Sequence, residues 1–131
     1  MKPQFIFVYG TLRRDFKSKM HSFLAEHADF IGRATYQGKL YKIDYYPGAV
    51  PSNNPKDVVY GEVYQLREPA LVLSKLDEYE ECGPKFPSPT EYIRKVQAVQ
   101  LEKKETLLAW IYLYNLSIKN LQRIFSGNFL E

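Results

Sequence analysis

The amino-acid sequence predicts a small α+β protein in which strands outnumber helices. Aromatic residues make up 15% of the chain, including 11 Tyr and 8 Phe, and large rings pack well on the pleated surface of a sheet. Apolar runs and alternating segments predict several strands, whereas helical spacing is limited to a few short stretches. The length of 131 residues is typical of one domain, so we expect residues 1–131 to form a single domain.

The order of the elements follows from the periodicity of the apolar residues. The segment 5–8 is a continuous apolar run, which is typical of a strand buried on both faces. Further strands are expected at residues 30–43 (as a hairpin or as one strand with a bulge), 58–66, 91–101 and 106–114. Helices are expected at about residues 18–27, at 69–81 beginning with Pro69, and in the tail through Ile118, Leu121 and Phe125. Turns and loops are expected at residues 45–51, 52–55 and 82–89.

Composition and charge argue against several classes of function. The net charge of +3 is too small to favour nucleic-acid binding, which requires a concentrated basic face. One Cys cannot form an internal disulfide, and one Cys with two His is too small a set for an all-N/S structural zinc site. The sequence contains neither the roughly 20 consecutive apolar residues of a membrane helix nor the apolar region of a signal peptide near its start. We therefore expect a cytoplasmic protein that binds neither nucleic acid nor a membrane.

Glu80 is distinctive because helical geometry turns it towards the interior. At about 100° per residue, Leu73, Leu76 and Glu80 fall on one stripe of the expected helix, while Glu78 points to the opposite side. Burial would raise the pKa of such a carboxyl group, which suits a general acid/base near neutral pH. Periodicity alone leaves two other interpretations open: Glu80 reaches solvent at a frayed helix end, or it pairs with Arg94 or a lysine.

A second candidate is the turn Tyr9-Gly10-Thr11-Leu12, which follows the first strand. Successive backbone N–H groups in such a turn can form a nest for a carboxylate or a phosphate. An ordinary strand-to-loop turn has the same composition. The basic residues that come next could attract an anionic substrate or could form a solvated face; they are Arg13, Arg14, Lys17 and Lys19.

A third candidate is a thiol nucleophile, Cys82, with His21 or His27 as its base. A lone cysteine is more often a packing residue than a nucleophile. A serine nucleophile has no support from a Gly-x-Ser-x-Gly element.

Together, these features resemble the γ-glutamylcyclotransferase-like family, and in particular its small single-domain branch, which includes the γ-glutamylamine cyclotransferases. The segments that carry the resemblance occur in order along most of the chain: Phe7-Val8-Tyr9-Gly10-Thr11-Leu12, Gly61-Glu62-Val63-Tyr64, Leu76-Asp77-Glu78-Tyr79-Glu80, Tyr92-Ile93-Arg94 and Trp110-Ile111-Tyr112. The resemblance implies an α+β fold around a small mixed β-barrel or roll with a few short helices, and an active cavity at one end.

The resemblance also implies a set of site residues. Tyr9, Gly10, Thr11 and Leu12 would form the substrate-binding loop, and Glu80 would be the general acid/base. We add Tyr92 to the substrate-binding residues, as a neighbour of Glu80. The family uses no metal and no cofactor. We further expect Arg94 to pair with Asp77 or with backbone carbonyls, which would keep Glu80 free.

The implied reaction is a γ-glutamyl cyclotransfer, in which the α-amine of a γ-glutamyl-amine or γ-glutamyl-amino acid attacks its own γ-carbonyl and releases 5-oxoproline. The chain departs from the amine-specific enzymes after Glu80, where Glu81 replaces the usual glycine and a longer segment with Pro84, Pro87 and Pro89 follows. The leaving amine is therefore left open. The alternative from another class is a non-catalytic module that binds a small ligand or a partner on the same barrel.

Overall fold

The protein has an α+β fold in which a curved sheet closes into a barrel. A computed structural model describes residues 4–10 and 19–129. The elements, in chain order, are β1 (Phe5–Val8), α1 (Lys19–His27), β2 (Ala28–Lys42), β3 (Pro47–Pro51), β4 (Val58–Leu66), α2 (Pro69–Tyr79), β5 (Tyr92–Leu101), β6 (Thr106–Tyr114) and β7 (Gln122–Arg123).

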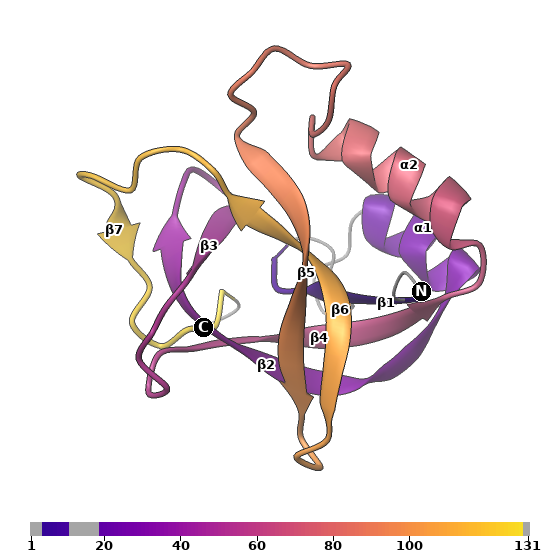
Figure 1. The fold of residues 1–131 in the computed structure, drawn as a ribbon, viewed down its shortest axis with the longest axis horizontal. Coiled ribbons are helices and arrows are strands. Elements are labelled where there is room, and N and C mark those ends of the chain that lie inside the picture. Colours follow the sequence, from indigo (N-terminus) through magenta and orange to yellow (C-terminus); the bar gives the residue numbers. More distant parts are fainter. Residues whose placement is uncertain (1–3, 11–18, 130–131) are drawn as a thin grey trace.

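The barrel is closed by β2, a strand of 15 residues. The strands follow the order β2-β4-β1-β6-β5, and β5 pairs again with β2 through Ala34 and Thr35. The pairing of β1 with β6 is parallel, whereas β1 and β4 are antiparallel, so the barrel is mixed as expected. A bulge between Phe30 and Gly32 bends β2, which confirms the single bulged strand over the hairpin. Figure 1 shows β5 and β6 crossing in front of β2 and β4.

β1 is buried on both faces, as its apolar run predicts. Ile6 and Val8 belong to a core cluster that includes residues of the two helices. Phe7, between them, points into a second cluster made by the barrel strands. The exposed fraction of all three is at most 3%. The strand therefore separates the barrel interior from the layer under the helices.

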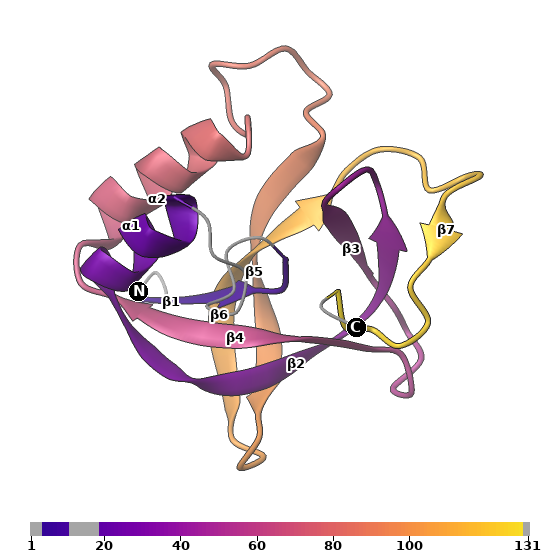
Figure 2. The same cartoon turned by 180° about the vertical axis from the view of Figure 1, so that it is seen from behind.

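The two helices pack side by side against the same side of the barrel (Figures 1 and 2). α2 begins with Pro69 at its first turn, where the missing N–H of proline is not needed. Its buried residues, Val72, Leu73 and Leu76, have the spacing of one helix face. This face anchors the helix and so fixes the position of the residues at its C-terminal end.

The expected turn at residues 45–51 is wrong, because Pro47–Pro51 forms β3 and pairs with the end of β2. Proline is tolerated there, since β3 has β2 as its one strand partner among the described residues. Gly48 is required for close packing, because a Cβ at this position would lie 2.8 Å from the Cβ of Tyr114.

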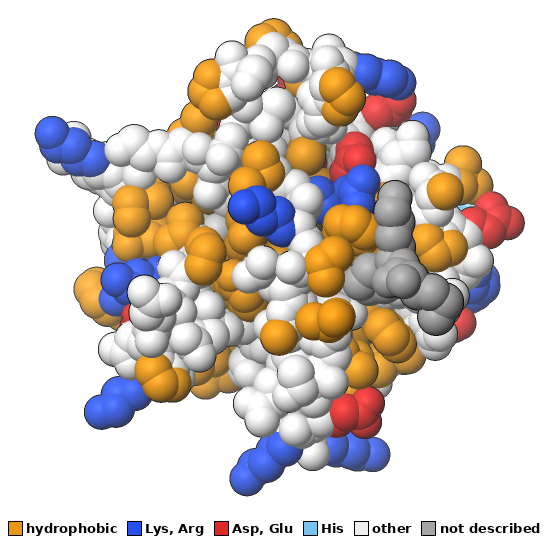
Figure 3. All heavy atoms as spheres, in the orientation of Figure 1, with side chains coloured by type: hydrophobic (Ala, Val, Ile, Leu, Met, Phe, Trp, Pro, Cys, Tyr) orange, Lys and Arg blue, Asp and Glu red, His pale blue; other side chains and the backbone are white. Residues whose placement is uncertain are grey.

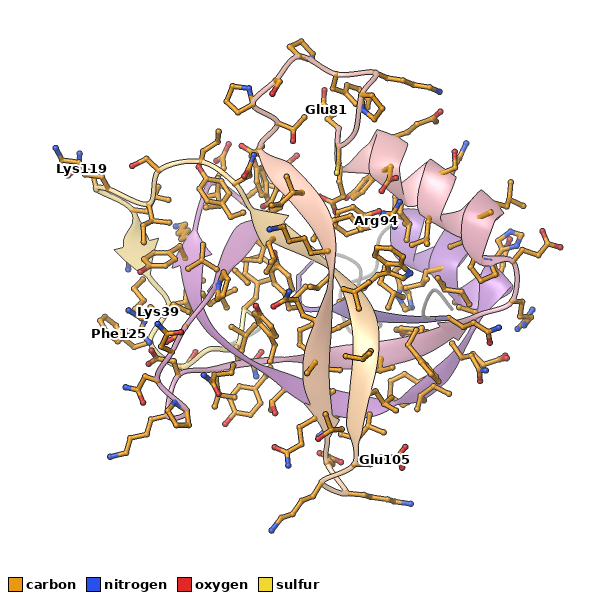
Figure 4. The ribbon with its side chains drawn as sticks, in the orientation of Figure 1. Lys39, Glu81, Arg94, Glu105, Lys119 and Phe125 are labelled. Atoms are coloured by element: carbon orange, nitrogen blue, oxygen red, sulfur yellow. The ribbon has the colours of Figure 1, made fainter. Side chains whose placement is uncertain are left out.

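The expected C-terminal helix is also wrong. The tail instead forms the short strand β7, and the N–H of Ile124 donates to the carbonyl of Leu40 in β2 at 2.7 Å. Arg123 is held by Asp57, with 2.8 Å between Nη2 and Oδ1. Phe125, which should have faced the core, is 82% exposed and lies on the side of β7 (Figure 4). Pairing with β2 therefore outweighs the helical spacing of the tail.

None of the helices in the described ranges is long and apolar enough to cross a membrane. Figure 3 shows the Lys and Arg side chains of one face at scattered positions around exposed hydrophobic side chains. This face therefore has no single concentrated patch of positive charge among the residues that the structure describes.

Gly61 allows a stability test, because β4 passes close to β1 at this residue. A Cβ on Gly61 would lie 2.6 Å from Cζ of Phe7 and would also clash with the carbonyl oxygen of Val8. We expect Gly61→Ala to lower the free energy of unfolding by about 1–3 kcal/mol, as overpacking does, in a urea titration. The matched control is Gly32→Ala, where a Cβ has no neighbour within 4 Å; a loss of similar size in both variants would contradict this account.

Candidate functional site

A cavity of about 240 Å³ opens where β1 ends, between the C-terminus of α2 and the beginnings of β3 and β5. Its wall is aromatic and acidic. The residues that line it are Phe7, Val8, Tyr9, Gly10, Tyr45, Tyr46, Pro47, Tyr79, Glu80, Glu81, Glu91, Tyr92 and Tyr112. The cavity thus brings together five of the residues singled out in the sequence from three separate segments: Tyr9, Gly10, Glu80, Glu81 and Tyr92.

Glu80 is the residue that caps the C-terminal end of α2. Its backbone N–H donates to the carbonyl of Leu76 at 2.9 Å, so its place follows directly from the buried turn before it. The side chain is partly buried on the cavity wall. The predicted inward face of the helix through Leu73 and Leu76 is confirmed. Glu78, on the other side, is exposed, and its Oε1 lies 3.7 Å from Nζ of Lys85.

The carboxyl group of Glu80 has no hydrogen bond or ion pair with any residue in the described part of the chain. Burial raises its pKa to about 7, and the negative charges of Glu91 and Asp77 act in the same direction. Removing a carboxylate from water disfavours its charged form, and nearby anions do the same. The group can therefore both accept and donate a proton near neutral pH.

Arg94 forms its ion pair with Asp77, which confirms the expected pairing. The guanidinium donates to both carboxylate oxygens, through Nε at 2.8 Å and Nη2 at 3.0 Å. The Tyr112 hydroxyl donates to the same carboxylate at 2.6 Å, and the guanidinium stacks over the ring of Trp110. Figure 4 shows Arg94 between β5 and α2. Because this two-point pair occupies the arginine, the alternative Arg94–Glu80 pair does not form.

Tyr9 and Tyr92 line the cavity, but their hydroxyl groups are bonded to the backbone. Tyr9 donates to the carbonyl of Tyr112 and accepts from the N–H of Ala49 at 3.1 Å. Tyr92 donates to the carbonyl of Pro47. Burial raises the pKa of both phenols, so both stay neutral. These tyrosines therefore present rings to the cavity and hold β1, β3 and β5 together around it.

Gly10 lines the cavity at the end of β1. The other two residues of the expected binding loop, Thr11 and Leu12, lie outside the described residues. Sequence reasoning missed Tyr46 and Glu91, which also line the cavity. Tyr46 directly precedes β3 and Glu91 directly precedes β5, so neither belongs to a periodic pattern that would mark it in the sequence. The two residues come together only because the barrel closes.

Cys82 does not share the cavity with Glu80. It lines a neighbouring hollow with Leu73, Arg94 and Trp110, and burial raises the pKa of its thiol, which disfavours the reactive thiolate. His21 packs against Tyr64 and His27 against Phe23. These contacts argue against a Cys–His nucleophile. Within the described ranges, no group of three or more His, Cys, Asp or Glu side chains could hold a metal ion.

The raised pKa of Glu80 has a consequence for stability. Its value of about 7 in the folded protein lies above the 4.5 of an unperturbed glutamate. The folded state therefore binds this proton more tightly, and the associated stability is complete below pH 4.5 and is lost as the pH rises through about 7.

We therefore expect Glu80→Gln to raise the melting temperature more at about pH 8 than at about pH 5, because the amide carries no charge at either pH. Thermal unfolding at the two pH values measures this difference. Glu78→Gln, on the exposed side of α2, should change the two melting temperatures equally. An equal effect of Glu80→Gln at both pH values would contradict the raised pKa.

Comparison of the chain with known proteins identifies one family. A family described as "Gamma-glutamyl cyclotransferase, AIG2-like" matches residues 6–131. The chain is 34% identical over 127 residues to the γ-glutamylcyclotransferase family protein ytfP of Citrobacter rodentium, with 96% of this chain and 95% of that protein covered. It is 33% identical to YtfP of Escherichia coli K12, with 96% of each chain covered.

Solved structures have the same fold. The solution structure of ytfP from Escherichia coli superposes with a TM-score of 0.66 at 31% identity, covering 97% of this chain and 96% of that one. The crystal structure of YkqA from Bacillus subtilis superposes with a TM-score of 0.71 at 28% identity, covering 97% of this chain and 39% of the longer YkqA chain. The α+β barrel expected from the sequence is therefore confirmed.

Proposed function

Because the chain belongs to the γ-glutamyl cyclotransferase, AIG2-like family, we propose that it is a cofactor-independent γ-glutamyl cyclotransferase with Glu80 as its general acid/base. The substrate is a γ-glutamyl-amine or a γ-glutamyl-amino acid. The products are 5-oxoproline and a free amine. The single-domain organisation and the cytoplasmic location remain predictions from the sequence.

The observation that carries the proposal is the Glu80 carboxyl group, partly buried on the cavity wall and without a partner among the described residues. A structural carboxylate in such a place would be expected to bind a cation. Here the nearby arginine is bonded to Asp77 instead. The pKa of about 7 is near the operating pH, where a proton shuttle works best.

The reaction moves two protons from the α-nitrogen to the leaving nitrogen of the folded substrate. The α-ammonium group loses one proton to Glu80, and the resulting amine attacks the γ-carbonyl carbon, which forms the ring C–N bond. Glu80 gives this proton to the leaving nitrogen as the bond between that nitrogen and the carbonyl carbon breaks. The ring nitrogen then loses its second proton, which the released amine takes up. Atoms balance without water or an oxidant. Because nucleophile and carbonyl belong to one molecule, holding the folded conformer removes much of the entropic barrier.

The cavity fits this role in size and in the character of its walls. Its volume of about 240 Å³ is somewhat below the usual range of ligand sites, which suits a compact γ-glutamyl group whose leaving amine extends through the opening. The rings of Tyr9 and Tyr92 provide rigid walls. Backbone N–H groups from Gly10 onward, in the loop expected to bind substrate, are the proposed donors to the α-carboxylate or to the developing oxyanion.

Replacement of Glu80 tests the proposed role. Glu80→Gln should lower kcat by about a hundredfold or more with the fold intact, because an amide cannot exchange the proton. The assay follows 5-oxoproline from a panel of γ-glutamyl-amines, γ-glutamyl dipeptides and glutathione. Glu78→Gln is the matched control and should keep kcat within about threefold of wild type.

A kcat of Glu80→Gln within a few-fold of wild type would remove Glu80 from the mechanism. If in addition the wild-type protein binds members of the panel without forming 5-oxoproline, the non-catalytic binding module becomes the better description.

The pH dependence of the reaction provides a separate test. Glu80 must be ionised to accept the proton of the α-ammonium group, so kcat/KM should rise with pH through an apparent pKa of about 7. Initial rates with the best substrate of the panel, measured between about pH 5 and pH 9, report this limb. A rate that is already at its plateau near pH 5 would show that the group responsible has an ordinary carboxyl pKa.

A further inference from the structure

We propose that Glu91 is a second acidic residue of the substrate site, which binds the α-ammonium group of the substrate while Glu80 moves the proton. This inference rests on the proposed function. It assigns the α-ammonium group of the substrate to Glu91, which lies in none of the sequence segments that resemble the family. Glu91 would position the substrate and balance its positive charge, while Glu80 exchanges the proton.

Glu91 and Glu80 reach the same cavity from different elements. Glu80 directly follows α2 as its C-cap, whereas Glu91 directly precedes β5. The Tyr46 hydroxyl lies 2.8 Å and 2.9 Å from the two Glu91 carboxylate oxygens. One phenol supplies one proton, while an ionised carboxylate can accept several hydrogen bonds. Glu91 is therefore held in place with acceptor capacity left for a ligand.

No cation of the described residues forms an ion pair with Glu91. The arginine nearest in sequence, Arg94, is bonded to Asp77, and Lys85 is 3.7 Å from Glu78. The described cavity lining contains three glutamates and no Lys, Arg or His. A fixed carboxylate in such a cavity is complementary to an ammonium group, and the α-ammonium is the positive charge that every γ-glutamyl substrate carries.

The chemistry explains why a second carboxylate is useful. Glu80 becomes neutral when it accepts the substrate proton, so it cannot hold a positive charge at that stage. The attacking nitrogen gains positive charge as its bond to the carbonyl carbon forms, and it keeps that charge until its second proton leaves. A carboxylate that keeps its charge through this step, and is already oriented by Tyr46, stabilises that nitrogen without reorganisation.

The charges around Glu80 agree with this division of roles. After burial, Glu91 is the first charge that raises the Glu80 pKa, followed by Asp77. The other titratable groups that interact with Glu80 are Tyr9, Tyr92, Tyr112 and Cys82. Burial raises the pKa of each phenol and of the thiol, so they stay neutral. Loss of the Glu91 charge should therefore also lower the pKa of Glu80.

The test compares two ligands that differ only in the α-amine: γ-glutamylethylamide and N-ethylglutaramate, its deamino analogue. Binding is measured by calorimetry in the Glu80→Gln background, in which turnover should be about a hundredfold slower or more. The ligand with the amine should bind about tenfold tighter or more, as hydrogen bonds to charged groups do. In Glu80→Gln/Glu91→Gln this preference should fall to less than about twofold, because the amide keeps the Tyr46 bond and loses the charge.

Two controls separate a ligand contact from a structural role. Tyr46→Phe removes the hydrogen bond but leaves the Glu91 charge, and Glu81→Gln removes one exposed charge from the cavity rim. Both variants, in the same background, should retain the preference for the amine. A preference that survives Glu91→Gln, or that Tyr46→Phe erases to the same extent, would overturn the proposal.

Turnover separates this inference from the proposed function. In the otherwise wild-type enzyme, Glu91→Gln should raise KM and move the acidic limb of the kcat/KM profile to lower pH, while Glu81→Gln leaves that limb in place. If Glu91→Gln changes neither, yet 5-oxoproline forms and depends on Glu80, only the role of Glu91 is wrong. If neither γ-glutamylethylamide nor any other member of the γ-glutamyl panel binds in any background, the γ-glutamyl site itself is contradicted.

Discussion

The ion pair between Asp77 and Arg94 determines the protonation of Glu80, the residue that directly follows α2. Asp77 accepts both guanidinium hydrogen bonds and a third from Tyr112, which joins the last turn of the helix to β5 and β6. Breaking a partly buried ion pair costs more than an exposed one, so this pair is a firm attachment for the helix end. It also keeps the positive charge away from Glu80, which thus retains a pKa near neutrality.

The cavity combines rigid aromatic walls with a carboxyl group that has no partner among the described residues. The hydroxyls of Tyr9 and Tyr92 are bonded to backbone carbonyls of β6 and β3, so these rings cannot turn towards a ligand as donors. Their hydrogen bonds instead hold the strand ends at fixed separations. Carboxyl groups are therefore the main reactive groups of the described wall. Glu80 has no partner within the described ranges, and Glu91 is oriented by one phenol. Close placement of these carboxyl groups lowers the stability of the folded state. Such a loss of stability is common where a protein performs catalysis.

Much of the fold could be predicted from local sequence patterns. The apolar run of β1, the proline at the start of α2 and the alternation in β4 each define one element on their own. The inward position of Glu80 in the candidate site was predictable from helical geometry, since the spacing from Leu73 and Leu76 places it on the buried face. Elements held by pairing were not predictable: β3 and β7 exist because β2 is long enough to pair with both. For the same reason Glu91 and Tyr46, 45 positions apart, had no signal in the sequence.

Glu80 has no counter-ion in the part of the chain that the structure describes, and we expect its carboxyl group to titrate near neutral pH. The most direct measurement is an NMR titration of the glutamate side-chain carboxyl carbons in uniformly ¹³C-labelled protein, with the Glu80 signal assigned by its loss in Glu80→Gln. We expect a midpoint of about 7 for this signal. A midpoint at or below the ordinary 4.5, as for a solvated or ion-paired glutamate, would contradict it.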